Sequence, residues 1–256
     1  MSFVINPYRF GGGPPPSGTP TPLHWWDLDS LTITDQGDSG TTFDLDAVGA
    51  GVSAGGTAAP DGGASINFNN IPIATNDYLE NTGGGNIAWD GAGDDMSVAI
   101  WGYGAPLTDT GNMLINWRAA STSIINTMFF QNLATDAYTA VISDDADTID
   151  VATTTTPTYA NSTWFHLVQT MENATGDHKL YINGVLRDTS NFAHTGIPTE
   201  SVPFAIGRLA SNKLADEFRH DGRVWCAGIW DEVLTADQIN DDLYNAGNGN
   251  KYADLW

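Results

Sequence analysis

Short apolar and aromatic runs alternate with clusters of Gly, Asn, Asp and Thr from about Leu23 to Leu234. Runs of this length, bounded by turn-forming residues, are typical of a sandwich or barrel built from many short strands. The pattern therefore predicts an all-β fold. The predicted strands are residues 23–28, 65–68, 96–103, 112–118, 128–133, 137–142, 163–171, 179–182, 185–189, 204–209 and 223–230. The Gly/Thr-rich pieces 49–63 and 152–158 are predicted loops.

Two local signals are sharper than the general pattern. Asn183-Gly184 separates two strand-like runs, and this dipeptide favours a two-residue type I′ hairpin. One helix is predicted over residues 235–247, where Thr235 and Gln238 have capping-box spacing and Gly247 can end the helix. We expect this short helix to pack on the edge of the sandwich.

The first residues differ from everything that follows. Residues 1–10 are apolar and aromatic, residues 11–22 form a Gly/Pro linker, and no acidic residue precedes Asp27. We therefore divide the chain into an arm with its linker, residues 1–22, and a sandwich domain, residues 23–256. An extended linker of this length reaches about 35 Å, enough to contact a neighbouring molecule.

The arm carries more apolar groups than a solvated tail normally does. It could fold back on its own domain, bind a sister copy in a homo-oligomer, or bind a different protein. The residues predicted to bind the partner are Phe3, Ile5, Tyr8, Arg9 and Phe10.

Charge narrows the range of partners. The 256 residues include 31 Asp and Glu but only 9 Lys and Arg, which gives a net charge of −22. Such a surface repels nucleic acid and anionic membranes, so neither is an expected partner. No run approaches the roughly 18 apolar residues of a membrane span, and the N-terminus lacks the basic and apolar regions of a signal peptide.

Candidate catalytic residues are sparse. The five glutamates are scattered, with no Glu-x-Asp-x-x-Glu strand to place two carboxylates on one face, as glycan hydrolysis would need. A nucleophile elbow and His/Cys metal-binding spacings are also missing. The single cysteine, Cys226, lies among apolar neighbours and is predicted to be buried, as is His166. We therefore predict that the chain is not an enzyme.

Calcium is the one cofactor that the sequence supports. Hard oxygen ligands on loops suit Ca²⁺, although no EF-hand pattern is present. The stronger candidate is the acidic run 143–150, and residues 35–40 are a weaker one. For each of these runs, the alternative is a solvated acidic loop that binds no metal. The predicted ligands are Asp144, Asp145, Asp147 and Asp150.

Sugar binding would require an exposed aromatic beside Asn or Asp side chains. Most of the nine tryptophans should lie in the core, because large aromatic residues dominate sandwich cores. The possible platforms are Trp101, Tyr103, Trp117 and Trp230.

The run from Trp164 to Thr189, WFHLVQTMENATGDHKLYINGVLRDT, resembles the central signature of laminin-G-like, concanavalin A-like sandwiches. The pieces FAIGRLASNK, IWDEVLTADQINDDLYNAG, LHWWDLDS and SINFNN resemble other strands of this family and its closing helix. The matching signature residues are Trp164, His166, Val168, Leu180, Tyr181, Ile182, Asn183 and Gly184. The resemblance implies a two-sheet antiparallel jelly-roll sandwich. The chain departs from the family where Trp225 and Cys226 stand in place of an acidic pair.

The arm and linker, joined to such a domain, resemble virion structural proteins of tailed phages. This resemblance implies a non-enzymatic protein on the virion surface, serving in capsid decoration or with the tail, and bound to other virion proteins or sister copies through residues 1–22. Two alternatives stay open: a lectin-like adhesin that binds a host-surface glycan, and a glycan-active enzyme with an unrecognised site.

Overall fold

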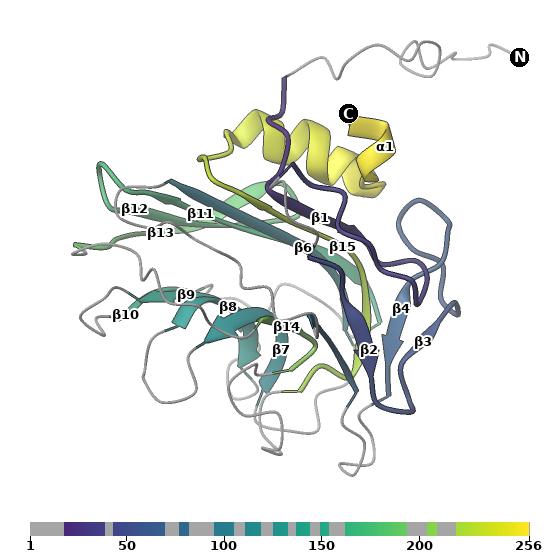
Figure 1. Ribbon diagram of the computed structural model, residues 1–256. Helices are drawn as coiled ribbons and strands as arrows, with labels where there is room; N and C mark the ends of the chain where they lie inside the picture. Colours follow the sequence, from purple (N-terminus) through teal and green to yellow (C-terminus); the bar gives the residue numbers. More distant parts are fainter. Residues whose placement is uncertain are drawn as a thin grey trace, which may run out of the picture.

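Two antiparallel sheets face each other across a shared apolar core (Figure 1). The computed structural model describes residues 18–38, 43–69, 77–81, 95–104, 111–118, 125–132, 137–143, 149–153, 162–193, 204–208 and 219–255. In these residues the predicted two-sheet antiparallel sandwich is confirmed.

The larger sheet has eight strands and the smaller sheet has seven. In spatial order, the larger sheet contains β13 (Val185–Asn191), β12 (Asp177–Ile182), β11 (Trp164–Glu172), β6 (Met96–Gly104), β15 (Gly222–Trp230), β4 (Ile66–Phe68) and β3 (Ser53–Ala54), with β1 (His24–Asp27) also pairing with β15. The smaller sheet contains β10 (Ile149–Thr153), β9 (Ala137–Ser143), β8 (Ile125–Asn132), β7 (Gly111–Arg118), β14 (Phe204–Ile206), β5 (Tyr78–Glu80) and β2 (Asp46–Val48).

All of the predicted strands are present, with ends that differ by a few residues. The strands that were not predicted are β2, β3, β5 and β10. The first three have only two or three residues each, too few to show an alternating pattern. Of the predicted loops, residues 49–63 contain β3, and residues 152–158 overlap the end of β10.

The predicted hairpin joins β12 to β13. Asn183 has φ +51° and Gly184 has φ +73°, which is the pair of positive angles that a type I′ turn requires. In the first arm, Leu180 and Ile182 point into the core and are fully buried. Tyr181 points the other way and is also buried, because the outer face of this sheet is covered.

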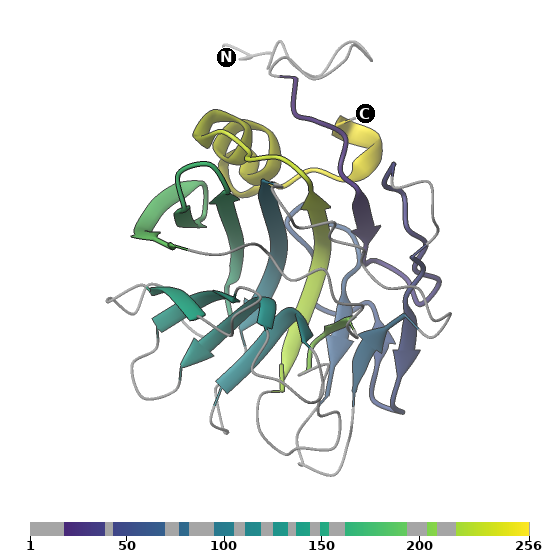
Figure 2. The same ribbon diagram turned by 60° about the vertical axis from the view of Figure 1, so that its left-hand side comes forward.

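The cover is the C-terminal helical segment, residues 235–255. It contains the π-helix η2 (Gln238–Tyr244), the 3₁₀ turn η3 (Asn245–Gly247) and the single-turn helix α1 (Tyr252–Leu255). Figures 1 and 2 show it lying over one end of the larger sheet, in yellow. None of the described helices is long and apolar enough to cross a membrane.

The predicted capping box begins this helical segment. The Gln238 backbone N–H donates to Thr235 Oγ1 at 3.2 Å, and the Thr235 N–H donates to Gln238 Oε1 at 2.8 Å. The regular helix ends before the predicted Gly247, because Asn245 and Ala246 already have left-handed φ values of +47° and +52°. The helix α1 was not predicted.

An irregularity in β15 sets which residues face this cover. Opposite β6, the register shifts between Val224 and Ala227, so Trp225 and Cys226 occupy the space of one residue. A bulge of this kind changes the phase of the alternation. Both residues therefore point outward and are buried under the helical segment, while Val224 and Ala227 on either side face the core. The prediction that Cys226 is a buried apolar residue is confirmed.

Candidate functional site

The helical segment leaves part of the larger sheet's outer face uncovered. There, four side chains from four neighbouring strands lie in one cross-strand row, because β4, β15, β6 and β11 pair in register at these positions. We call this set the open row; it consists of Asn67, Arg223, Tyr103 and Trp164. All four are half-buried, and with neighbouring strands about 4.8 Å apart the row is about 14 Å long.

The aromatic end of the open row is held in place. The rings of Tyr103 and Trp164 are 5.3 Å apart and inclined at 59°. Trp164 Nε1 donates a hydrogen bond of 2.8 Å to the carbonyl oxygen of Ala58, in the loop that follows β3. The two rings therefore form a fixed, partly exposed apolar surface.

The polar end of the row is held by a glycine turn. Arg223 Nη1 donates to the carbonyl oxygen of Gly55, and the guanidinium lies directly against Gly56. A Cβ atom at residue 56 would lie 2.2 Å from Arg223 Nη2, and Gly56 has φ +93°, so only glycine fits here. The turn thus fixes the guanidinium beside Asn67.

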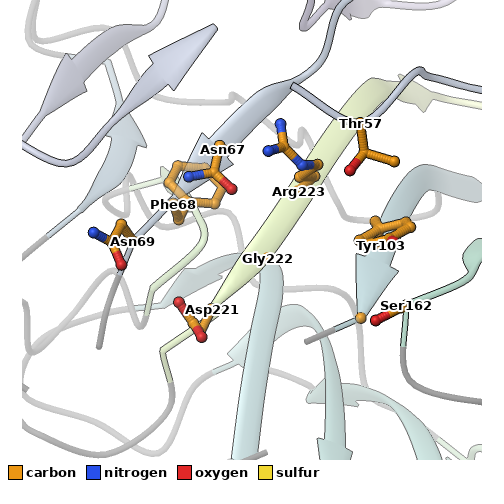
Figure 3. Close-up of a pocket in the computed structure, with 10 residues that line it drawn as sticks. Thr57, Asn67, Phe68, Asn69, Tyr103, Ser162, Asp221, Gly222 and Arg223 are labelled. Carbon is orange, nitrogen blue, oxygen red and sulfur yellow. The ribbon is translucent and has the colours of Figure 1, made fainter. Parts of the chain in front are cut away.

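A cavity of about 280 Å³ opens along this row (Figure 3). Its lining is mainly polar, and in Figure 3 Asp221 and Asn69 lie on one side while Tyr103 and Ser162 lie on another. The described lining residues are Thr57, Asn67, Phe68, Asn69, Tyr103, Gly104, Ser162, Asp221, Gly222 and Arg223. Most small-ligand sites are lined mainly by apolar side chains with a few polar groups, so this mainly polar hollow with an aromatic ring suits a polar ligand.

His220 supports the site from behind. Its Nε2 donates to the backbone carbonyl of Arg223 at 3.1 Å, and its ring contacts Phe68 at 6.1 Å between centroids. Burial lowers the pKa of His220 to about 4, although the bond to the Arg223 carbonyl opposes this shift. His220 is therefore neutral at physiological pH and holds the start of β15.

Of the four predicted sugar platforms, the structure places one in the open row. Trp101 and Trp230 are 3% and 0% exposed, so neither can stack on a ligand. The side chain of Trp117 lies outside the described residues. Tyr103 is half-buried and lines the cavity.

His166 occupies the covered part of the same face. Its ring stacks on Trp101 at 4.9 Å and on Tyr244 at 6.3 Å, and burial lowers its pKa to about 3. The prediction that His166 is buried is confirmed. Within the described residues, its Nδ1 has no hydrogen-bond partner.

The predicted calcium ligands fall in different parts of the structure. Asp144, Asp145 and Asp147 lie outside the described residues. Asp150 lies in β10, where Oδ2 accepts hydrogen bonds from His178 Nδ1 at 2.6 Å and from Ser190 Oγ. Burial raises the pKa of Asp150, but these bonds and the charge of His178 outweigh it and leave the pKa below its usual value.

The weaker calcium candidate contains an aspartate that organises its own loop. The Asp35 carboxylate accepts from His24 Nδ1 at 2.6 Å and from the backbone N–H groups of Trp25, Gly37 and Phe43. In the described part of the chain, no group of three or more His, Cys, Asp or Glu side chains could hold a metal ion. The calcium site therefore stays a prediction.

Asp150, His178 and Ser190 look like a hydrolase triad by composition but not by geometry. Asp150 and Ser190 both approach the same His178 nitrogen, Nδ1, with Ser190 Oγ at 3.4 Å. In a triad, the serine bonds to the opposite nitrogen, Nε2. His178 Nε2 is buried and has no partner among the described residues. The three side chains instead join β10 of one sheet to β12 and β13 of the other.

The arm residues Phe3, Ile5, Tyr8, Arg9 and Phe10 lie outside the described residues. The end of the linker is described and packs on the domain: Trp230 Nε1 donates to the Pro20 carbonyl at 2.9 Å, and Gln238 Nε2 donates to the Gly18 carbonyl at 3.3 Å. Thr19 is buried and donates to Asp242. The linker therefore meets the domain beside the helical segment, as both ribbon views show.

The sequence reasoning did not select Asn67, Trp164 or Arg223 as site residues. Signals were present for each of them. Asn67 stands between two core residues, so alternation alone would place it on the outer face, and Arg223 is a cation directly before an apolar run. Trp164 belongs to the family signature. The register between distant strands, which brings the three together, could not be read from the chain.

Comparison with known proteins gives a family match and several similar folds. A family model described as the concanavalin A-like lectin/glucanases superfamily (Laminin_G_3) matches residues 74–240. The search of curated proteins found no match. Among solved structures, the binding domain of botulinum neurotoxin serotype D has a TM-score of 0.60 at 15% identity, over 86% of this chain and 50% of that chain.

Two further toxin structures are similar in the same way. The binding domain of Paraclostridial Mosquitocidal Protein 1 has a TM-score of 0.59 at 15% identity, over 86% of this chain and 51% of that chain. The binding domain of botulinum neurotoxin serotype G has a TM-score of 0.57 at 13% identity, over 86% and 50%. This chain spans about half of each, and at these identities the likeness shows the fold alone.

Proposed function

Because the chain belongs to the concanavalin A-like lectin/glucanases superfamily, we propose that it is a carbohydrate-binding protein and that the open row is its binding site. The observation that carries this proposal is the row itself, where fixed aromatic and polar side chains line one open cavity. The fold alone would not support it, because one fold serves many functions.

The chemistry of the row suits a sugar. A pyranose has an apolar C–H face that packs on an aromatic ring, and a rim of hydroxyl groups that need hydrogen-bond partners. Tyr103 lines the cavity and Trp164 extends the aromatic surface beside it, while Asn67, Asn69 and Asp221 supply amide and carboxylate groups at the cavity. Amphipathic aromatic residues with a few fixed polar groups are typical of such ligand sites.

We propose binding without catalysis. Glycoside hydrolysis normally uses two carboxyl groups about 5–10 Å apart, on either side of the scissile bond. Among the described residues that line the cavity, Asp221 is the only one with a carboxylate. The similar toxin structures are named as binding domains, which agrees with this proposal.

The test is glycan binding with matched variants. The protein should bind immobilised oligosaccharides, and Trp164→Ala and Tyr103→Ala should each weaken binding at least tenfold, about 1.4 kcal/mol. Leu186→Ala is the control, since Leu186 is 46% exposed on β13 at the far edge of the same sheet. Equal binding by all three variants would place the site elsewhere, and no binding to a broad glycan array would overturn the proposal.

We further propose that residues 1–22 attach the domain to a virion, either to other virion proteins or to sister copies. Two observations support this. The first ten residues and their linker resemble tailed-phage virion proteins, and the linker meets the domain at the Trp230 end of β15. The open row crosses β15 at Arg223. Arg223 and Trp230 pair with Tyr103 and Ser97, which are six residues apart on β6, so the two points lie about 20 Å apart along the strand and attachment would leave the site exposed.

Deletion tests the attachment. Because residues 18–22 pack on the domain, the cut belongs after residue 17. The truncated protein should stay folded and keep glycan binding, but it should no longer be incorporated into purified particles or form oligomers. If it unfolds, the arm belongs to its own core; if it still assembles, residues 1–17 are not the anchor.

A further inference from the structure

Arg223 is one of only nine Lys and Arg residues in this acidic protein. Among the described residues, Lys179 pairs with Asp177 at 3.2 Å, and Lys251 pairs with Asp29 at 2.6 Å and with Asp61 at 3.5 Å. For Arg223, no carboxylate of the described residues lies within ion-pair distance. Its charge faces the cavity of the open row instead.

The guanidinium is fixed but not saturated. Among the described residues, one of its five N–H donors is used, by the Gly55 carbonyl, and the contact with Gly56 holds the plane of the group in place. A planar guanidinium with two further parallel donors matches the two oxygens of a carboxylate. Asp221 lies on another side of the cavity, as Figure 3 shows.

We infer that the open row recognises an oligosaccharide carrying a single carboxylate-bearing sugar, with Arg223 binding that carboxylate. This inference rests on the proposed carbohydrate-binding function and names its ligand class. Arg223 lies between Asn67 and Tyr103 in the row, so the acidic sugar would have an amide on one side and an aromatic ring on the other. The length of the row leaves room for neighbouring sugars of the same chain.

The charge of the whole protein limits the ligand to few acids. A net charge of −22 repels long anionic chains, and this repulsion acts over about 8–10 Å at physiological salt. One carboxylate placed on Arg223 is neutralised locally. A polymer with an acid on every sugar would bring further negative charges against the acidic surface. A glycan with one acid is therefore favoured over a polyanion.

The experiment compares acidic and neutral probes in pairs. One pair is 3′-sialyllactose and lactose, and the other is a trisaccharide ending in glucuronic acid and the same trisaccharide ending in glucose. The two pairs distinguish a sialic from a uronic acid. Titrations use the full-length protein, the Arg223→Gln variant and the Arg187→Gln variant. Arg187 is exposed on β13, so the latter variant makes the same change in net charge away from the cavity.

In at least one pair, we expect the acidic probe to bind tenfold or more tightly than the neutral one. Arg223→Gln should remove this preference, while Arg187→Gln should keep it. If Arg223 were only structural, Arg223→Gln would weaken both probes alike and leave their ratio unchanged, which would overturn the inference. Equal binding of acidic and neutral probes by the unaltered protein would also overturn it, without touching the proposed function.

Polygalacturonate provides a third arm. It should bind more weakly than the singly charged probe, and tighter binding would overturn the single-acid inference. If none of these probes binds and no glycan on the wider array binds, the proposed carbohydrate-binding function is overturned, and this inference with it.

Discussion

The outer face of the larger sheet has two halves that are built from the same strands and behave differently. On each of β6, β11 and β15, one residue lies under the helical segment, and a residue two positions along the same strand belongs to the open row. The pairs are Trp101 and Tyr103, His166 and Trp164, and Trp225 and Arg223. Positions two apart on a strand lie about 7 Å apart on the same face. The sheet therefore offers equivalent positions, and coverage alone separates them.

The helical segment provides that coverage through specific contacts. The ring of Tyr244 stacks on Trp101 at 5.8 Å, and Gly249 lies against the ring of Trp225. The tip of the β12–β13 hairpin also touches the segment: a Cβ atom on Gly184 would lie 2.5 Å from Asn240 Oδ1. An aromatic residue under this cover contributes to stability, whereas one beyond its edge is available to a ligand.

The largest difference between the two halves is expected when one tryptophan in each half is replaced by alanine. Trp225 is fully buried, so Trp225→Ala should lower the free energy of unfolding by about 3–5 kcal/mol. Trp164 is half-buried, and Trp164→Ala should lower the free energy of unfolding by less, while weakening glycan binding at least tenfold. Urea denaturation and glycan titration measure the two effects. If Trp164→Ala destabilises the protein as much as Trp225→Ala, the two halves do not differ as described.

Much of the fold could be predicted because its signals are local. The long strands have clear apolar runs, Asn183-Gly184 dictates its own turn, and Thr235 with Gln238 forms its cap within four residues. Short strands such as β2, with the sequence DAV, carry too little pattern and are stabilised by their partner strand, β5.

The site was harder to predict because it depends on distant contacts. Trp101 and Tyr103 are two positions apart on one strand and face the same side of the sheet, so the alternation of apolar and polar residues cannot tell which of them is exposed. That difference comes from Tyr244, more than 140 residues later in the chain. The bulge at Trp225 and Cys226 adds a second obstacle, because it interrupts the alternation along β15.

Acid should destabilise the protein through one histidine in each half. His166, under the cover, has a pKa lowered to about 3, and His220, behind the open row, has a pKa lowered to about 4. Both stay neutral in the folded state, whereas the unfolded state binds protons below a pH of about 6.5. Stability should thus be unaffected above pH 6.5 and fall as the pH drops toward 4, by about 2 kcal/mol per histidine at pH 5.

Urea unfolding at pH 7.5 and pH 5 measures this loss. In His166→Gln, the difference in unfolding free energy between the two pH values should shrink by about 2 kcal/mol, whatever the stability of the variant at pH 7.5. An unchanged difference would show that His166 is protonated in the folded state, and therefore that the helical segment does not keep it from water.

The capping box allows a weaker change to the cover alone. Thr235→Ala removes the acceptor for the Gln238 N–H and should lower the free energy of unfolding by about 1 kcal/mol. Thr235→Ser keeps a hydroxyl and should lose much less. Glycan binding should be unchanged in both, because the open row does not depend on this cap. Weaker binding by Thr235→Ala would show that the two halves are coupled.

The smallest effect is expected at Asp150, which lies at the sheet edge and belongs to neither half. Asp150→Asn weakens the hydrogen bonds from His178 and Ser190 at a half-buried position, so the loss should be at most about 1 kcal/mol near neutral pH. Because the pKa of Asp150 is lowered in the folded protein, its contribution is present above about pH 4 and disappears as the pH falls further. The variant and the unaltered protein should therefore converge in stability at acidic pH.

The same position tests the calcium prediction, since an ion at residues 144–150 would compete with His178 for the carboxylate. Calorimetric titration with Ca²⁺ should then show binding that is lost when Asp144, Asp145, Asp147 and Asp150 are all replaced by Asn. Heat that persists in that fourfold variant would place calcium elsewhere, and no heat in the unaltered protein would leave Asp150 as a link between the two sheets.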